Sequence, residues 1–425
     1  MEEDPALQPT MTPLRPGTLA VHPWATAHGR PRGHRTLNAP LFLSTQWEGA
    51  DLAQLAELFA STPDRGFYTR FGHPTARLAE ERLASLEGAD DALVFASGMG
   101  AISTSLLAVL RAGDHVVAHQ SIFAQTIQLL EHLRDAFGVD VHFVDATVPE
   151  AVEAALRPDT RLLYLETPSN PLVEVLDVAA LAAAARRRGA LVFVDSTFAG
   201  PIVQRPLALG ADLSLQSASK SLSGHADVLA GCVAGGAELI ARIRRMRVLT
   251  GPSLDPHACW LLLRGMQTLP LRMRGQSETA AAVAGQLEAS PTVGHVRYPF
   301  LDSHPASAVA RRQMELGGCM VSFAFRGGLE DTRCFVRALR WIPLASSLGS
   351  VFTTLEVPEE LDFASEEIGE RQDAYAMPPG LVRLSVGAED ARDIQEDVAR
   401  GLEAVARRHR DADARRPARG EPASA

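Results

Sequence analysis

Short, almost wholly apolar segments that alternate with helix-like stretches restrict the fold of this sequence more than any other feature. A strand with one wet face would alternate apolar and polar residues, so wholly apolar strands predict a sheet covered by helices on both faces. The alternation of strand and helix predicts a mainly parallel, doubly wound α/β sheet. Six strands are expected, at residues 93–95, 116–118, 141–144, 162–165, 191–194 and 213–216.

Changes of character along the chain predict four parts. The expected parts are an irregular N-terminal arm at 1–62, the α/β domain at 63–255, a smaller C-terminal α+β domain at 256–406 and a disordered tail at 407–425. The tail is rich in Arg, Ala, Pro and Asp and has no apolar periodicity.

Apolar spacing within the smaller domain predicts its main elements. They are a long helical stretch at 257–269 and then 272–287, a helix from residue 331, and strands at 320–325 and 381–386.

Charge and cysteine content exclude several functions. The net charge of −10 disfavours nucleic acid as a partner. The arginines at 186–188 and 242–247 fall in helix-like stretches and are expected to line solvated helix faces. The four cysteines form no C-x-x-C pair, and no histidine lies at metal-ligand spacing, so we expect neither a disulfide framework nor a metal site.

Targeting signals are missing from the sequence. No apolar run approaches the ~20 residues that cross a bilayer. The first residues are acidic and Pro-rich and lack the pattern of a signal peptide. We therefore expect a cytoplasmic protein that has no membrane partner.

Small residues follow the strand expected at 93–95. The run Ala-Ser-Gly-Met-Gly-Ala at 96–101 opens a helix-like stretch, so the N–H groups of Gly98 and Met99 could bind a phosphate. A tight strand–helix turn without any ligand gives the same short pattern.

Charged residues follow two further strands. Asp195, after residues 191–194, would cap a helix, join an ion pair, or keep a pyridine nitrogen protonated. Lys220, after residues 213–216, is either a surface lysine or a desolvated amine that binds an aldehyde, with Ser217 and Ser219 as donors to a phosphate. Ligands of open parallel sheets bind beyond the carboxyl ends of the strands, so these features in chain order indicate one site.

Four motifs in this order resemble those of the Cys/Met-metabolism enzymes that depend on pyridoxal 5'-phosphate (PLP). They are Phe95-Ala96-Ser97-Gly98-Met99, Glu166-Thr167-Pro168-Ser169-Asn170-Pro171, Val194-Asp195-Ser196-Thr197-Phe198 and Ser217-Ala218-Ser219-Lys220. The resemblance runs from about residue 18 to 402. The family includes cystathionine γ-synthase, the cystathionine and methionine lyases and the acylhomoserine sulfhydrylases. It implies PLP fold type I, the aspartate-aminotransferase-like architecture, with residues 63–255 as the PLP-binding domain.

The resemblance implies roles on the cofactor side. Lys220 matches the lysine that binds the cofactor covalently and moves protons, and Asp195 matches the partner of the pyridine nitrogen. The phosphate cup is matched by the N–H groups of Gly98 and Met99 and the hydroxyls of Ser217 and Ser219.

The resemblance also implies contacts made by other segments. Tyr68 and Arg70 match a segment that reaches the phosphate of a neighbouring subunit, as a planar guanidinium suits phosphate. Asn170 matches a residue near the cofactor's 3' oxygen. Arg383 matches the clamp for the substrate α-carboxylate, and Ser347 belongs to the loop that helps to hold that carboxylate.

Several positions depart from the family pattern. Phe123 stands where most members have tyrosine; its ring can stack on the cofactor but has no hydroxyl to donate to a leaving group. Phenylalanine here also resembles the O-succinylhomoserine sulfhydrylase branch. Further departures are Ser221 for a tyrosine, His73 for an asparagine, Ser346 for the glutamate of γ-synthases and cystathionine γ-lyases, and Asp362-Phe363 near the place of a Thr-His pair.

We therefore expect a PLP-dependent enzyme that replaces the γ-substituent of an activated homoserine ester, or a related amino acid, with a thiol or sulfide. One alternative is a C–S lyase that carries out γ- or β-elimination on cystathionine- or methionine-type substrates. The other is a non-catalytic PLP-fold binding or regulatory protein, which the altered lining favours and the retained Lys220, Asp195 and Arg383 oppose. By the resemblance, the assembly is a homotetramer, a dimer of dimers with active sites shared across each dimer.

Overall fold

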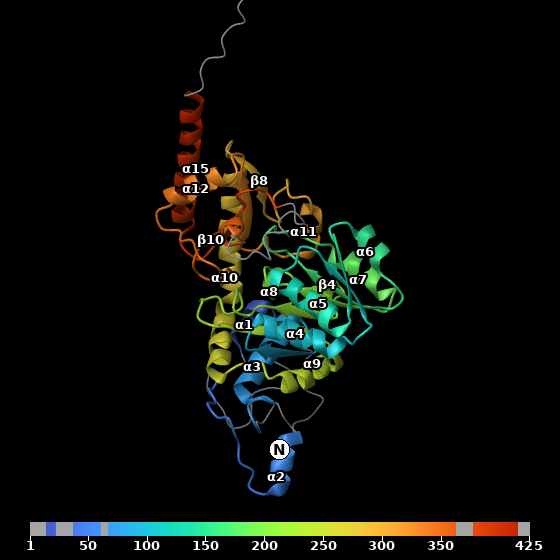
Figure 1. Cartoon of the computed structure of the whole chain (residues 1–425). Coiled ribbons are helices and arrows are strands. Elements are labelled where there is room, and N and C mark those ends of the chain that lie inside the picture. Colours follow the sequence, from blue (N-terminus) through green and yellow to red (C-terminus); the bar gives the residue numbers. More distant parts are fainter. Residues whose placement is uncertain (1–13, 23–36, 61–66, 363–376, 415–425) are drawn as a thin grey trace, which may run out of the picture.

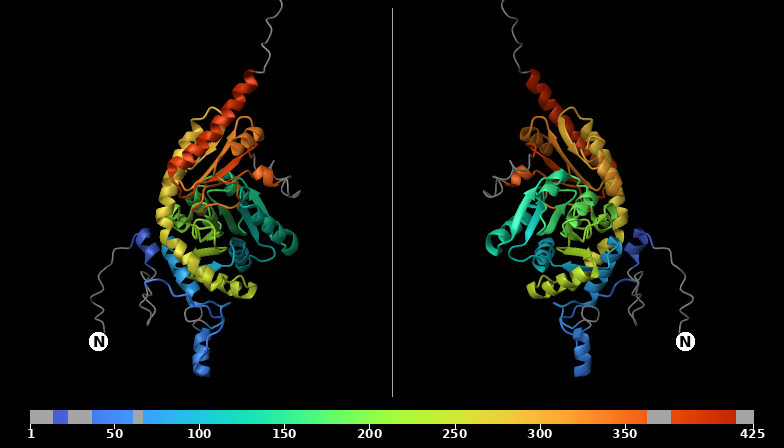
Figure 2. Two further views of the ribbon diagram at one scale, coloured as in Figure 1. Left: turned by 90° about the vertical axis from the view of Figure 1, so that its left-hand side faces the viewer. Right: turned by 90° about the vertical axis from the view of Figure 1, so that its right-hand side faces the viewer.

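Two sheets and a long connecting helix form the framework of the computed structural model (Figure 1). The structure describes residues 14–22, 37–60, 67–362 and 377–414. Helix α10 runs along one side of the molecule, from the large sheet to the small one (Figure 2). Within the described residues, no helix is long and apolar enough to cross a membrane.

The large sheet has seven strands in the order β1-β7-β6-β5-β4-β2-β3. The bounds are β1 Asp91–Phe95, β2 His115–His119, β3 Asp140–Val144, β4 Thr160–Glu166, β5 Leu191–Asp195, β6 Leu213–Gln216 and β7 Gly231–Gly235. All six predicted strands are present, and the mainly parallel sheet is confirmed.

Strand β7 was not predicted, and it runs antiparallel to both β1 and β6. Its sequence, Gly-Cys-Val-Ala-Gly, is short and rich in small residues that are weak strand formers. Gly231 is needed for packing rather than for strand propensity, because a Cβ there would lie 2.1 Å from the carbonyl oxygen of Ser97.

Helices cover both faces of this sheet. They are α3 Pro74–Glu87, α4 Gly98–Val109, α5 Ala124–Phe137, α6 Pro149–Ala155, α7 Val178–Arg186, α8 Gly200–Val203, the 3-10 helix η2 Pro206–Leu209 and α9 Ala237–Thr250. Val94 of β1 packs in one apolar core, whereas its neighbours Leu93 and Phe95 pack in another on the opposite face. Both sides of the strand are therefore dry, which explains the lack of apolar–polar alternation.

The smaller sheet is antiparallel, with strand order β10-β11-β9-β8. Its elements, with the helices that accompany it, are α10 Pro256–Glu288, β8 Val293–Arg297, α11 Ser307–Gln313, β9 Met320–Phe325, α12 Leu329–Ala338, β10 Thr354–Glu356, α13 Pro358–Asp362, β11 Val382–Ser385 and α15 Ala391–Ala414. The long helical stretch expected at 257–269 and then 272–287 is one continuous helix. Helix α10 continues through Pro270, which is buried between Leu269 and Met273 in the core, so packing outweighs the lost backbone hydrogen bond.

The prediction of a disordered tail from residue 407 was wrong for residues 407–414. Helix α15 continues to Ala414 because Arg408 and His409 both bond the buried carboxylate of Asp331 in α12. Residues 415–425 lie outside the described part of the chain. At the other end, the arm contains two helices rather than irregular chain alone: α1 Pro16–Val21 packs against α3 and α10, and α2 Leu52–Ala60 projects from the molecule (Figure 1).

The arginines at 242–247 do not all line a solvated face, contrary to the expectation. Arg247 is buried and donates to Glu80 of α3 at 2.8 Å and to the carbonyl of Val94 at 2.8 Å. Arg244 also pairs with Glu80, at 3.3 Å. A buried carboxylate needs such partners. Helix α9 therefore turns Arg244 and Arg247 towards Glu80 rather than towards solvent.

Candidate active site

The polar residues that follow β5 and β6 form a connected chain of hydrogen bonds. Asp195 ends β5, and its Oδ1 accepts from the backbone N–H of Thr197 at 3.0 Å and from the Thr197 hydroxyl at 2.6 Å. The same hydroxyl oxygen accepts from the backbone N–H of Ser217 at 2.8 Å. The ends of the two strands are thus fixed relative to one another, as expected for the edge at which parallel sheets bind ligands.

Asp195 is a buried carboxylate, 4% exposed, with no ion pair among the residues described. Burial raises its pKa to about 6, although the hydrogen bonds from Thr197 act in the opposite direction. Glu166 is its neighbour across the β4–β5 pairing. Burial and the charge of Asp195 raise the pKa of Glu166 well above its usual value. Two acidic groups without a cation leave a strong demand for positive charge at this point.

Hydrogen-bond donors gather near these strand ends at the start of α4. Ser97 caps the helix by accepting from the N–H of Gly100 at 3.0 Å. The N–H groups of Gly98 and Met99 belong to the first turn, where no helical carbonyl is available to them. Gly98 lies directly against Ser217, because a Cβ on Gly98 would be 3.2 Å from the Ser217 hydroxyl oxygen. Helix N–H groups and a hydroxyl are thereby brought together, as a phosphate requires.

Lys220 lies in the turn after β6 and donates from Nζ to the hydroxyl of Ser347 at 2.7 Å. Burial, with repulsion from Arg383, lowers the pKa of this lysine. Ser347 itself has a left-handed backbone, φ 78°, which non-glycine residues rarely adopt. Its hydroxyl contacts Lys220 and its carbonyl accepts from Arg383 at 3.1 Å, so one residue links the two cationic side chains.

Arg383, on β11, is held by three acceptors. Its Nη1 donates to Oδ1 of Asn170 at 2.8 Å, and its Nη2 donates to the carbonyl of Ser347 and to Glu356 at 2.6 Å. The structure therefore brings together four of the predicted residues, Asn170, Lys220, Ser347 and Arg383. Glu356 was not predicted; it is the cross-strand neighbour of Arg383 in the β10–β11 pair, and β10 was not recognised in the sequence.

Glu166 is a second residue that the sequence analysis did not single out, although it begins the Glu-Thr-Pro-Ser-Asn-Pro motif. Its two carboxylate oxygens accept from the backbone N–H of Phe123 at 2.7 Å and from that of Asn170 at 3.2 Å. Phe123 occupies the N-cap position of α5 and is 38% exposed as a whole residue. Glu166 therefore fixes the relative positions of Phe123 and Asn170, and its place at the end of β4 was the signal that could have revealed it.

Three predicted residues are engaged elsewhere in this chain. The Ser219 hydroxyl donates to the carbonyl of Ala230 at 3.0 Å and accepts from the Ala230 N–H at 2.9 Å. Arg70 donates to the carbonyl of Val248, in the last turn of α9, at 2.7 Å. Tyr68 forms a β-bridge with Gln46 and is partly exposed. Within the part of the chain that the structure describes, neither Tyr68 nor Arg70 has a hydrogen bond to the cluster around Lys220.

The structure gives a local role to one departure from the family pattern, His73, and only a location to the others that it describes. His73 caps α3 by accepting from the N–H of Ala76 at 3.1 Å. Ser221 is buried. Ser346 lines a cavity together with Glu356. Asp362 ends α13, and Phe363 lies outside the described residues.

One cluster on the large sheet has the residue types of a metal site. Ligand atoms of His115, Asp140 and His142 lie within 4.8 Å of one another, although their sequence spacing did not predict it. Arg157 donates to Asp140 at 2.6 Å and lies 3.3 Å from Nδ1 of His142. A cation that already contacts two of the three residues makes this an ion-pair network, and we assign no metal to it.

The residues at the strand ends fit PLP. The cofactor carries a pyridine nitrogen, a phosphate and an aldehyde. The buried, unpaired carboxylate of Asp195 suits the protonated nitrogen, and the start of α4 with Ser217 suits the phosphate. Lys220, whose amine is partly desolvated, suits the aldehyde.

Comparisons with known proteins agree with this fit. Residues 17–403 match the model of the family described as Cys/Met metabolism PLP-dependent enzyme. An L-methionine gamma-lyase of Pseudomonas putida is 40% identical over 393 residues, which cover 92% of this chain and 97% of that protein. An O-succinylhomoserine sulfhydrylase of Pseudomonas aeruginosa is 38% identical over 388 residues, which cover 91% of this chain and 95% of the relative.

Solved structures show the same architecture. A cystathionine gamma synthase from Xanthomonas oryzae pv. oryzae, in complex with aminoacrylate and cysteine, superimposes with a TM-score of 0.87 at 35% identity and covers 93% of this chain and 100% of its own. These matches confirm fold type I, the dependence on PLP and the expectation of an enzyme. The chain belongs to the Cys/Met metabolism family of PLP-dependent enzymes.

Proposed function

We propose that this enzyme catalyses γ-replacement: an activated homoserine ester loses its acyloxy group, and a thiol or sulfide takes its place. The preference for replacement over elimination rests on Phe123. It caps α5 and is tied to Glu166 through its backbone, but its ring has no hydroxyl. A carboxylate leaves without a proton, whereas a thiolate benefits from an acid at this position. The similarity to an O-succinylhomoserine sulfhydrylase supports the same choice.

We assign the cofactor's contacts as follows. Lys220 holds the cofactor covalently through Nζ, and Asp195 supplies the negative charge beside the pyridine nitrogen. The N–H groups of Gly98 and Met99 bind the phosphate together with Ser217, and Ser219 does so only if its hydroxyl leaves Ala230. The ring of Phe123 would stack on the cofactor, and Asn170 would serve its 3' oxygen. When bound, PLP supplies the electron sink that makes the proton on Cα acidic.

The chain's own groups orient the substrate and move its protons. Arg383 binds the α-carboxylate, because a guanidinium can offer two parallel N–H donors. Lys220 takes the proton from Cα and delivers protons to carbon atoms further along. Ser347 accepts a hydrogen bond from Nζ at 2.7 Å and so limits the directions in which the amine can reach.

A C–S lyase is the second candidate, because several relatives that are 37–40% identical are L-methionine gamma-lyases. In that reaction the same residues remove the Cα proton, and the sulfur group leaves without a replacement. The product is a 2-oxo acid with ammonia.

Product analysis of the purified, PLP-loaded protein separates the two candidates. O-succinyl- or O-acetyl-homoserine is supplied with a thiol in one set of assays, and cystathionine or methionine alone in the other. We expect a new thioether in the first set and little 2-oxo acid in the second. Oxo-acid release from the second set, without thioether in the first, would reject γ-replacement.

We further propose a cytoplasmic homotetramer, built from two dimers whose active sites are shared. In this arrangement Tyr68 and Arg70 reach the phosphate in the partner subunit. The four cysteines are free, as suits a reducing compartment. Mixing Lys220→Ala chains with Arg70→Ala chains should restore part of the activity through hybrid dimers. A complete lack of rescue would contradict shared sites.

A further inference from the structure

The position of Glu356 leads to one further inference, which rests on the proposed role of Arg383 as the carboxylate clamp. Glu356 and Arg383 face each other across the β10–β11 pair, with 2.6 Å between Oε2 and Nη2. Their side chains are only 15% and 5% exposed. The clamp therefore already holds a carboxylate, and that carboxylate belongs to the enzyme.

The stereochemistry of the guanidinium shows why this matters. A guanidinium has two edges that offer a pair of parallel N–H groups: Nη1 with Nη2, and Nε with one of the terminal nitrogens. In the usual naming that terminal nitrogen is Nη2, so Nη2 belongs to both edges. Its two N–H groups donate to the carbonyl of Ser347 and to Glu356.

A second carboxylate cannot bind Arg383 through two parallel bonds until one of these acceptors withdraws. The Ser347 carbonyl is part of the backbone, whereas Glu356 is a flexible side chain. Nε is buried and has no hydrogen-bond partner among the described residues, so the edge that it shares with Nη2 has a donor free for a ligand. Glu356 is thus the group that must move.

We propose that Glu356 is an internal competitor for the substrate's α-carboxylate and sets the affinity of the clamp. In the empty site it neutralises Arg383, which would otherwise be a buried, incompletely paired charge. On substrate binding, the incoming carboxylate takes its place on Nη2. The clamp thereby selects ligands with a free carboxylate and rejects esters and amides, which cannot replace the lost charge.

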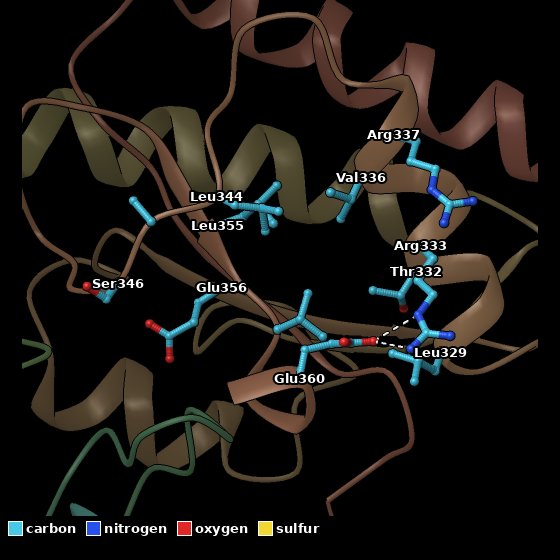
Figure 3. Close-up of a pocket in the computed structure, with 12 residues that line it drawn as sticks. Leu329, Thr332, Arg333, Val336, Arg337, Leu344, Ser346, Leu355, Glu356 and Glu360 are labelled. Carbon is cyan, nitrogen blue, oxygen red and sulfur yellow. Dashed lines mark hydrogen bonds and ion pairs between the residues drawn. The ribbon is translucent and has the colours of Figure 1, made fainter. Parts of the chain in front are cut away.

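The displaced side chain has a place to go. Glu356 lines a cavity of about 450 Å³ between β10, α12 and the segment at 344–346 (Figure 3). Figure 3 shows the Glu356 carboxylate turned away from Arg333 and Arg337, which line the cavity on the side of α12. Arg333 is already paired with Glu360 at 2.7 Å and Glu330 at 2.9 Å, whereas Arg337 has no ion pair within the described chain. A carboxylate that turns into this cavity regains water and a basic neighbour.

Competition and simple orientation make opposite predictions for Glu356→Gln. If Glu356 competes, its replacement by the uncharged, isosteric glutamine should strengthen carboxylate binding. If Glu356 only orients Arg383, the same change should weaken binding.

The test is the competitive inhibition constant of butyrate, which has a carboxylate but no amino group, measured on the PLP-loaded enzyme. We expect butyrate to bind Glu356→Gln about tenfold more tightly than wild type, equivalent to ~1.4 kcal/mol. The KM for the amino-acid substrate should fall together with the butyrate constant, while kcat changes by less than about twofold. The Glu356–Arg383 pair exists only in the free enzyme, so its removal changes binding and not the later steps. Weaker butyrate binding in Glu356→Gln would overturn the proposal.

Glu360→Gln is the matched control. It makes the same chemical change in the same cavity, but it pairs with Arg333 and not with the clamp. Its butyrate constant should equal that of wild type. An equal gain in butyrate affinity in both variants would mean that the loss of any negative charge near the site strengthens binding. That result would also reject the competitor role.

A further variant separates failure of this inference from failure of the proposed site. Arg383→Ala is combined with Glu356→Gln, so that no carboxylate is left buried without its partner. Butyrate binding should be lost in this double variant. If it persists, Arg383 is not the clamp and the proposed site is wrong; if it is lost but Glu356→Gln alone also weakens binding, only the competitor role fails. Cofactor content and melting temperature of each variant verify that it is folded.

Discussion

The cofactor side and the substrate side of the site are built differently. On the cofactor side, Asp195, Thr197 and Ser217 are joined by backbone groups and one short hydroxyl at the ends of adjacent strands. On the substrate side, Arg383 and Glu356 of the small sheet meet Asn170 from the large-sheet part of the chain, and the Arg383–Asn170 bond joins residues 213 positions apart. The hydrogen bonds of the cofactor side leave its residues few degrees of freedom, and we call it the rigid side; the substrate side is the exchangeable side. The exchangeable side consists of one ion pair and several hydrogen bonds of Arg383, which can exchange partners, so specificity can change there while the cofactor side stays as it is.

Lys220→Ala is expected to have the largest effect, because it removes the one covalent contact of the rigid side. We expect turnover to fall by at least about a thousandfold, since both the attachment and the proton transfer are lost. Absorption spectra of the PLP-loaded protein provide the measurement, and the band of the lysine-bound cofactor should be absent. Ser347→Ala serves as the control, because it removes only the hydrogen-bond acceptor of Nζ. An unchanged spectrum in Lys220→Ala would contradict the assignment of the whole site.

Asp195→Asn should reduce activity and stabilise the cofactor-free protein, and the second effect has a definite pH dependence. The folded-state pKa of Asp195, about 6, lies above the unfolded value of ~3.9. The unfolded chain then ionises first as pH rises, so stability falls between about pH 4 and pH 6 and stays reduced above that range. The cost at pH 8 is at most about 3 kcal/mol, from two pKa units of 1.36 kcal/mol each.

Thermal melts of the cofactor-free proteins measure this cost. Asp195→Asn should melt higher than wild type at pH 8, and the difference should shrink towards pH 4. With PLP present, the order should reverse, because the variant lacks the charge that holds the pyridine nitrogen protonated. A variant that is less stable than wild type without PLP at pH 8 would contradict a net cost of burying the Asp195 charge.

The sequence predicted the rigid side better than the exchangeable side, for a physical reason. Apolar strands place whatever follows them at the sheet edge, so Asp195 and Lys220 could be located from their strands alone. Arg383 and Asn170 were named from motifs, but no local pattern could show that they bond each other. Glu356 escaped prediction because its role depends on the three-residue strand β10, which is too short to leave a periodic signal.

Two errors on the framework have the same origin. Strand β7 was missed because its glycine serves close packing against Ser97, a contact between segments far apart in sequence. The tail at 407–414 was taken as disordered because its helix depends on Asp331, which lies some 80 residues earlier. A polar segment whose partners are distant in sequence shows no local sign of them, so the sequence alone predicts that it is exposed to solvent.

The two serines before Lys220 offer a smaller test within the rigid side. Ser217 lies against Gly98, whereas the Ser219 hydroxyl is bonded to Ala230. Ser217→Ala should weaken PLP binding by about tenfold, the loss of one charge-assisted hydrogen bond. Ser219→Ala should instead lower the melting temperature of the cofactor-free protein with a smaller change in PLP affinity. Titration of each cofactor-free variant with PLP gives both results, and equal losses of affinity would mean that both hydroxyls bind the phosphate.

Phe123→Tyr should have the smallest effect, and it tests whether the division between the two sides holds for chemistry as well as for structure. The ring is partly exposed, and the residue is fixed through its backbone N–H to Glu166, so an added hydroxyl should leave the fold intact. A tyrosine supplies the acid that a departing thiolate needs. Release of 2-oxo acid from methionine or cystathionine should therefore rise by a few-fold, while turnover of the homoserine ester changes by less than about twofold. If both reactions rise together, the hydroxyl acts before the step at which the leaving groups differ. If neither rises, the missing acid is not what separates replacement from elimination, and specificity then resides in the ion pair and hydrogen bonds of Arg383.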